Sequence, residues 1–200
     1  MAALGSLRFG VLFFVASVFT CAACEQKKPA KRPDPTIEEP KEPKDDTPPP
    51  SEGWVAPSGP VHPAPFTAEQ IRDATKAGRK YRYRVEEPGK PPREHVITFL
   101  KVDESGCEIA NDGGPPKRMG WNMLQRHAEF PKDRVTTREV IKKTPAGKFE
   151  CVVYMVRGDD GETSHYYFAK DLPGAPIAYH TEKDGKRIRT TTLLEHDPGK

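Results

Sequence analysis

The stretch from residue 79 to residue 196 consists of short alternating segments separated by turn residues. In "RKYRYRVEE", for example, Tyr81, Tyr83 and Val85 alternate with arginines, so apolar and basic side chains point to opposite faces of a strand. The separators "ESG", "NDGGPP", "TPAG", "GDDGE" and "KDGK" are rich in Gly, Asp, Asn and Pro. Connections this short join antiparallel neighbours, because parallel strands need long crossovers. The pattern therefore predicts a predominantly antiparallel sheet.

Strands and helices can be assigned along this part of the chain. The candidate strands are 79–87, 93–103, 106–111, 133–144, 147–158, 163–170, 175–182 and 186–196. A first helix is predicted after Thr67, which forms a capping box with Gln70, and Gly78 offers a left-handed C-cap. A second is predicted in "WNMLQRHAEF" at 121–130. We expect a mainly β (α+β) domain: a curved antiparallel sheet or half-barrel of about seven or eight strands with two short helices.

The first 23 residues have the pattern of an export signal. Arg8 supplies the only side-chain charge before an uncharged apolar run from Phe9 to Ala23. This run is shorter than the roughly 20 residues that a membrane-spanning helix needs. Residues 1–23 are therefore predicted to be a signal peptide.

The sequence around Cys24 resembles the lipobox of bacterial lipoproteins. Ala22 and Ala23 supply the small residues that precede a cleavage site, and Cys24 follows them directly. In that family the cysteine receives a diacylglyceryl group, and a dedicated signal peptidase cuts before it. The resemblance implies that Cys24 is the lipid-attachment residue, with Cys21 as the alternative; secretion without lipid and an uncleaved signal anchor are the other outcomes. Two or more acyl chains would hold the protein stably on a membrane.

Residues 24–65 have the composition of a linker. The chain contains 22 prolines, many of them in "KKPAKRPDPTIEEPKEPKDDTPPP", where large apolar side chains are nearly absent. Such a segment buries too little surface to offset the entropy of ordering. Repeated prolines favour extended polyproline II backbone, so we expect a disordered, semi-rigid tether between the lipid and a domain at 66–200.

Charge and motifs exclude several classes of function. The net charge is only +3, with 32 basic and 29 acidic residues interspersed, which does not favour nucleic acid as a partner. The sequence contains no HExxH, CxxC, P-loop, GxGxxG or GxSxG pattern. We therefore predict no catalytic residue, no metal ligand and no cofactor. The exception to test is convergence of His165, His180 and His196 from the last strands.

Two cysteines, Cys107 and Cys151, belong to the predicted domain. In an oxidising compartment two cysteines favour one disulfide. The alternative is two buried free thiols that act as small hydrophobic side chains in different strands. Both interpretations stay open at the level of the sequence.

The order of elements, with "TPAGKFECVVY" and "HYYFAKDLPGAPIAYHTEKDGKRI", resembles the half-barrel proteins of the bacterial envelope, of which the lipoprotein carriers (LolA/LolB-like) are the best described. In that family a bent antiparallel sheet wraps around a short helix, and its concave face holds acyl chains. The resemblance implies the same fold here and makes binding of an acyl chain or another hydrophobic ligand one alternative function.

The sequence thus predicts a lipid-anchored protein of the bacterial cell envelope, at the outer membrane facing the periplasm or the cell surface. Its β-rich domain is predicted to be a non-catalytic binding module for an unknown envelope protein or hydrophobic ligand. An envelope hydrolase or metal enzyme is the second alternative.

Overall fold

A computed structural model describes residues 59–200. The predicted signal peptide, Cys21, Cys24 and most of the predicted linker lie outside the described residues. The strands are β1 (Val61–His62), β2 (Lys80–Glu86), β3 (Arg93–Asp103), β4 (Gly106–Asn111), β5 (Lys117–Gly120), β6 (Phe130–Pro131), β7 (Val135–Thr144), β8 (Gly147–Arg157), β9 (Glu162–Ala169), β10 (Ala178–Lys183) and β11 (Lys186–Asp197). The helices are α1 (Ala68–Ala74), α2 (Trp121–Arg126) and the 3-10 turn η1 (Lys132–Arg134).

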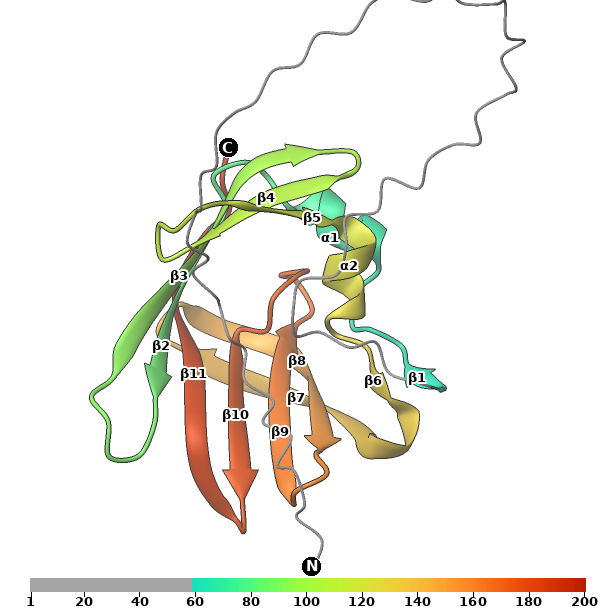
Figure 1. Ribbon diagram of the computed structural model, residues 1–200, viewed down its shortest axis with the longest axis vertical. Coiled ribbons are helices and arrows are strands. Elements are labelled where there is room, and N and C mark those ends of the chain that lie inside the picture. Colours follow the sequence, from blue (N-terminus) through green and yellow to red (C-terminus); the bar gives the residue numbers. More distant parts are fainter. Residues whose placement is uncertain (1–58) are drawn as a thin grey trace, which may run out of the picture. The chain divides into compact units, whose positions relative to one another are not determined.

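Nine of these strands form one curved, open antiparallel sheet, which confirms the predicted fold class (Figure 1). Their order across the sheet is β5-β4-β3-β2-β11-β10-β9-β8-β7. Each of the predicted strands is present. The ninth, β5, was missed because "KRMG" is short and lacks apolar alternation. The last strand, β11, pairs with β2, so this one ladder joins the two halves of the sheet.

The packed structure begins inside the segment that the sequence assigned to the linker. Strand β1 pairs with β6 through Val61 and His62. The hydroxyl of Tyr154 donates a 3.0 Å hydrogen bond to the carbonyl of Pro63, and the ring of His62 packs edge-on against Tyr154. The chain is therefore held on the domain several residues before residue 66.

Helix α1 starts as predicted. Thr67 is the N-cap: its side chain accepts a hydrogen bond from the backbone N–H of Gln70 at 3.2 Å. In return the side-chain oxygen of Gln70 accepts from the N–H of Thr67 at 2.9 Å. This reciprocal capping box satisfies two of the free N–H groups at the helix start. Phe66 and Ile71, on either side of it, are both buried in the core.

The predicted glycine C-cap of α1 is wrong. The helix ends at Ala74, and Thr75 has extended backbone, whereas Gly78 adopts its positive φ of 82° only in the following turn. The Thr75 hydroxyl donates to the carbonyl of Ile71 at 2.7 Å. A side chain, rather than a glycine turn, thus satisfies a carbonyl at the end of the helix.

Arg79 completes this helix end from inside the core, where it is only 1% exposed. One guanidinium nitrogen donates to the carbonyl of Ala74 at 3.1 Å and to the hydroxyl of Thr75 at 3.0 Å. Its Nε donates to Nε2 of His196 at 3.3 Å, and the guanidinium lies over the ring of Tyr81. Arg79 makes no ion pair with a carboxylate among residues 59–200, so the negative end of the α1 dipole and these acceptors stabilise its charge.

The two faces of the sheet carry different sets of side chains. Cross-strand partners share a face, so Tyr154, Tyr166 and Tyr179 lie together, as do Val153, Tyr167 and Ala178. We call the first the aromatic face; it also carries Tyr81, Tyr83, Phe168, Thr191 and Leu193. We call the second the histidine face, because His165 and His180 lie on it. Phe66 and Phe130 pack against the aromatic face, which makes it part of the main core.

Candidate functional site

The first candidate surface is the outer edge of β7. This strand is the last in the sheet order and pairs only with β8 among the described strands. Its outer backbone groups therefore offer a place for another strand to add. Ile141 is 61% exposed there, the highest exposure among the large hydrophobic side chains of the described part. Lys142 and Lys143 follow it, and charges of this kind oppose pairing between two copies of the same edge.

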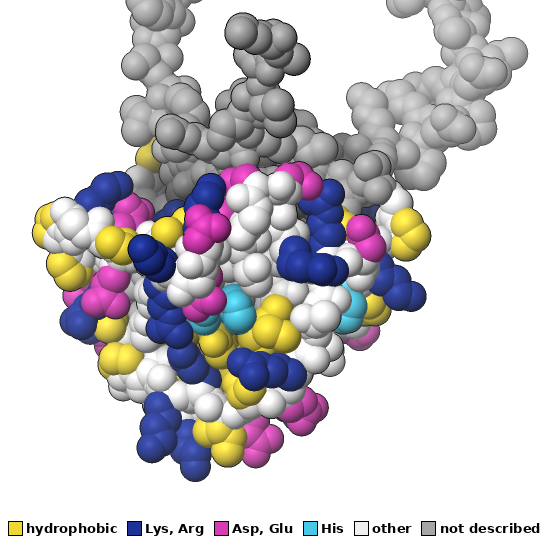
Figure 2. Space-filling model, turned by 90° about the horizontal axis from the view of Figure 1, so that it is seen from below, with side chains coloured by type: hydrophobic (Ala, Val, Ile, Leu, Met, Phe, Trp, Pro, Cys, Tyr) yellow, Lys and Arg dark blue, Asp and Glu magenta, His cyan; other side chains and the backbone are white. Residues whose placement is uncertain are grey.

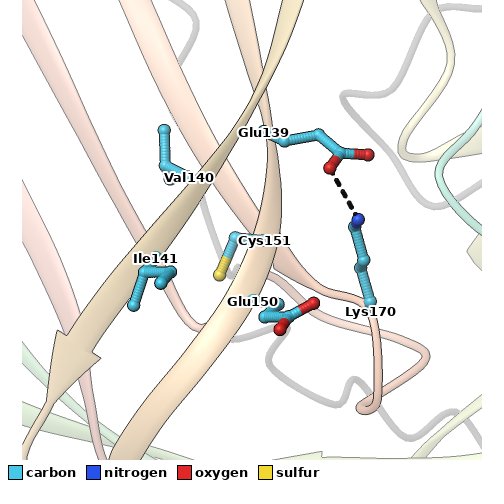
Figure 3. Close-up of a pocket in the computed structure, with 6 residues that line it drawn as sticks. All are labelled: Glu139, Val140, Ile141, Glu150, Cys151 and Lys170. Carbon is cyan, nitrogen blue, oxygen red and sulfur yellow. Dashed lines mark ion pairs between the residues drawn. The ribbon is translucent and has the colours of Figure 1, made fainter.

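A shallow pocket of about 330 Å³ lies along β7 and β8 next to this edge (Figure 3). It is lined by Glu139, Val140, Ile141, Glu150, Cys151 and Lys170. Lys170 forms an ion pair with Glu139, drawn in Figure 3 as a dashed line. The Nζ of Lys170 lies 2.8 Å from Oε2 of Glu139. Half of the lining residues are charged, which suits a polypeptide segment better than an acyl chain.

The face that would hold an acyl chain in a carrier is occupied by the protein's own side chains. Tyr81 and Leu193 are fully buried on the aromatic face, and Tyr83 and Phe168 are 3% exposed. The hydroxyl of Tyr83 donates to the carbonyl of Pro176 at 3.1 Å. This filled core argues against the predicted alternative of an acyl-chain or hydrophobic-ligand binder.

The second candidate is a cluster of His165, His180 and Glu182 on the histidine face, which we call the histidine cluster. His165 and His180 are direct cross-strand partners in β9 and β10, and their rings stack at 4.4 Å between centroids. Glu182 lies two residues after His180 in β10, on the same face. Its Oε1 is 3.2 Å from Nε2 of His180, and its Oε2 is 4.0 Å from Nε2 of His165.

Basic side chains surround the histidine cluster. A β-bulge after Thr181 places Arg187 opposite Glu182, with its Nε 3.4 Å from Oε1. From β7, the Nζ of Lys142 lies 4.4 Å above the ring of Tyr167, which packs near His180. Figure 2 views the end of the domain at which β10 turns into β11 and shows histidine and apolar side chains among Lys and Arg side chains.

Burial keeps the two imidazoles neutral. The side chains of His165 and His180 are 15% and 5% exposed. Burial lowers the pKa of His180 to about 4, with the neighbouring His165, Arg187 and Lys142 adding to the effect and Glu182 opposing it. Burial also lowers the pKa of His165. Both rings therefore present unprotonated nitrogen lone pairs at neutral pH.

Sequence reasoning named two of the three members of this cluster. His165 and His180 converge, whereas His196 lies at the end of β11, where it packs on Tyr81 and accepts from Arg79. Glu182 was missed, although the spacing in "HTE" places it on the same face of a strand as His180. The register between β9 and β10 brings His165 opposite His180. The segments "HYYF" and "AYHTE" do not specify this register by themselves.

Cys107 and Cys151 are free, buried thiols in the structure, which is the second of the two alternatives that the sequence left open. Cys107 lies in β4, the second strand of the sheet order, and Cys151 lies in β8, the eighth. Both side chains are buried. Burial raises the pKa of Cys107 to about 12 and also raises that of Cys151, so neither thiol has the thiolate character of a catalytic cysteine.

Within residues 59–200, neither helix is long and apolar enough to cross a bilayer.

The sequence matches no protein-family model and no curated protein. Among solved structures, it is similar to MucB in a complex with MucA(peri), with 14% identity and a TM-score of 0.45, over 65% of this chain and 52% of that chain. A structure titled MucB alone gives 11% identity and a TM-score of 0.44, over 65% and 56% of the two chains. A third structure, of the Pseudomonas aeruginosa MucA/MucB complex, has 12% identity and a TM-score of 0.41, over 65% of this chain and 53% of that chain. This chain thus spans about half the length of the structures it matches.

Proposed function

We propose that this protein is a lipid-anchored component of the bacterial envelope whose β-rich domain binds an extended segment of another envelope protein along β7. The anchor is acylated Cys24, and the Pro-rich segment carries the domain away from the membrane. The domain is a binding module rather than an enzyme. The observation that carries the binding role is the ten-residue strand β7, which has no hydrogen-bonded strand on its outer side among the described strands, although part of it also contacts β11.

The side chains of β7 indicate the chemistry of the partner. Glu139 forms an ion pair with Lys170, so the charges of β7 that have no ion pair within residues 59–200 are basic: Arg138, Lys142, which lies over the ring of Tyr167, and Lys143. Between them stands the exposed Ile141. A partner strand with an apolar residue flanked by acidic residues would complement this edge, because backbone pairing supplies affinity and the alternate side chains supply specificity.

The N-terminal sequence supports the anchor. A short uncharged run that ends at Ala22-Ala23-Cys24 is typical of a lipoprotein signal. Between Cys24 and the start of the packed domain at β1 lie 36 residues, of which 24 are prolines or charged residues. A single acyl chain holds a protein only reversibly, so the proposal requires at least two chains at Cys24.

Photo-crosslinking in the native cells tests the binding site. A photoreactive residue in place of Ile141 should give one discrete adduct, which peptide mapping should assign to an acidic, extended segment of one envelope protein. The same residue at Leu100, which is 44% exposed on β3, is the control and should give no such adduct. The reverse-charge pair Lys142→Glu and Lys143→Glu should lower the yield several-fold, because like charges across an interface repel.

An adduct that forms equally at positions 100 and 141 would contradict the proposal. So would an adduct that maps to the chain's own residues 24–58, or no adduct at position 141.

A further inference from the structure

We infer that His165, His180 and Glu182 form a binding site for a divalent transition-metal ion, with zinc as its best-suited occupant. The site would take two imidazole nitrogens and one carboxylate oxygen from the protein and leave a coordination position for water. It lies on the histidine face, and its residues come from β9 and β10 rather than from β7, although Arg138 and Lys142 of β7 lie close to it.

The three side chains lie close enough together to share one ion. The three side chains offer ligand atoms that all lie within 4.8 Å of one another. In a tetrahedral zinc site, with metal-ligand bonds of about 2.1 Å, the ligand atoms are roughly 3.4 Å apart. To close the site, the stacked rings and the Glu182 side chain would have to rotate so that the ligand atoms move closer together. The backbone already holds the ligands in register, because His165 and His180 are cross-strand partners.

His165 has hydrogen-bonding capacity that the protein does not satisfy. Its Nδ1 is buried and has no hydrogen-bond partner within the described part of the chain. Its Nε2 lies 4.0 Å from Glu182, beyond hydrogen-bond distance. Buried polar atoms without a partner are rare in proteins, and an absent ion is one of the few explanations. Either ring nitrogen can serve as a ligand atom, and a coordinate bond from Nδ1 would give this buried atom the partner that it lacks.

The donor set also suits zinc. Two imidazoles and a carboxylate with one open position are ligands that zinc prefers.

The neighbouring cations set the strength of binding. Arg187, which pairs with Glu182, would have to release it, and its side chain is 62% exposed and free to move into solvent. Arg138 and Lys142, also close to the cluster, disfavour an added cation. Removing the Arg187 charge should therefore strengthen metal binding.

Zinc titration of the purified full chain by calorimetry, with ¹⁵N NMR of the histidine side chains, tests the site. The expected result is one equivalent of zinc, with coordination shifts confined to the imidazoles of His165 and His180. His165→Gln and Glu182→Gln should each weaken binding at least about tenfold. His95→Gln is the matched control: His95 also contacts a carboxylate, Asp112, at 2.8 Å, but lies outside the cluster, so this variant should bind zinc like the wild type.

Arg187→Gln is expected to bind zinc more tightly than the wild type, because Glu182 is then released from its ion pair. An unchanged zinc affinity in this variant would contradict the assignment of Glu182 as a ligand. Saturable binding that is unchanged in His165→Gln and Glu182→Gln, or imidazole shifts at other histidines, would overturn the site. The NMR measurement on the wild type needs no variant to fold, so absence of zinc binding there would overturn it as well.

Discussion

Replacing Arg79 with alanine is expected to lower the free energy of unfolding by about 3 kcal/mol. The guanidinium is the donor for three acceptors: the carbonyl of Ala74, the hydroxyl of Thr75 and Nε2 of His196. Its removal leaves a helix end without its side-chain donor and opens a cavity beneath α1, in a place where Arg79 is 1% exposed. Urea unfolding followed by circular dichroism measures the loss as a lower midpoint at unchanged slope.

Arg82→Ala is the matched control for this prediction. Arg82 lies three residues further along, in β2, and pairs with Glu94 and Glu195 on the exposed surface. Exposed ion pairs contribute little to stability, so the midpoint should barely move. Equal midpoints for the Arg79 and Arg82 variants would contradict the structural role assigned to Arg79.

The second large effect is a loss of stability in mild acid that depends on His180. The pKa of His180 is about 4 in the folded protein, against 6.5 for a free imidazole. Above pH 6.5 the ring is neutral in both states and contributes nothing to the pH dependence. As the pH falls from about 6.5 to 4, His180 becomes protonated in the unfolded chain but stays mostly neutral in the folded protein. The free energy of unfolding therefore falls by about 3 kcal/mol.

His180→Gln should remove that part of the pH dependence. The free energies of unfolding of wild type and variant, measured near neutral pH and at about pH 4 with a chelator present, should differ in their pH dependence by about 3 kcal/mol. The variant loses stability from packing at both pH values, so only the difference between the two pH values is diagnostic. An identical decrease in both proteins would show that His180 does not resist protonation in the fold.

Much of the fold is predictable because local chemistry and tertiary structure agree along this chain. Alternation such as that of Tyr81, Tyr83 and Val85 predicted the strands, and glycine and aspartate turns predicted their antiparallel order. The capping box at Thr67 predicted the start of α1. The two-residue strands β1 and β6 were not predictable, because nothing local in "VH" or "FP" indicates that they pair.

The candidate sites were less predictable because they depend on register and burial. A one-residue change of register between β9 and β10 would place His165 and His180 on opposite faces. The bulge that turns Arg187 toward Glu182 has no glycine or proline to mark it. Arg79 was not singled out from the sequence, because its burial follows from the position of α1 against the sheet rather than from its own neighbours in sequence.

The anchor at Cys24 is tested most directly by the intact mass of the protein purified from its native membranes in detergent. The account predicts a chain that begins at Cys24 and carries the mass of at least two acyl chains there. A chain that starts at Met1, or one that begins at residue 24 without added lipid mass, would contradict it.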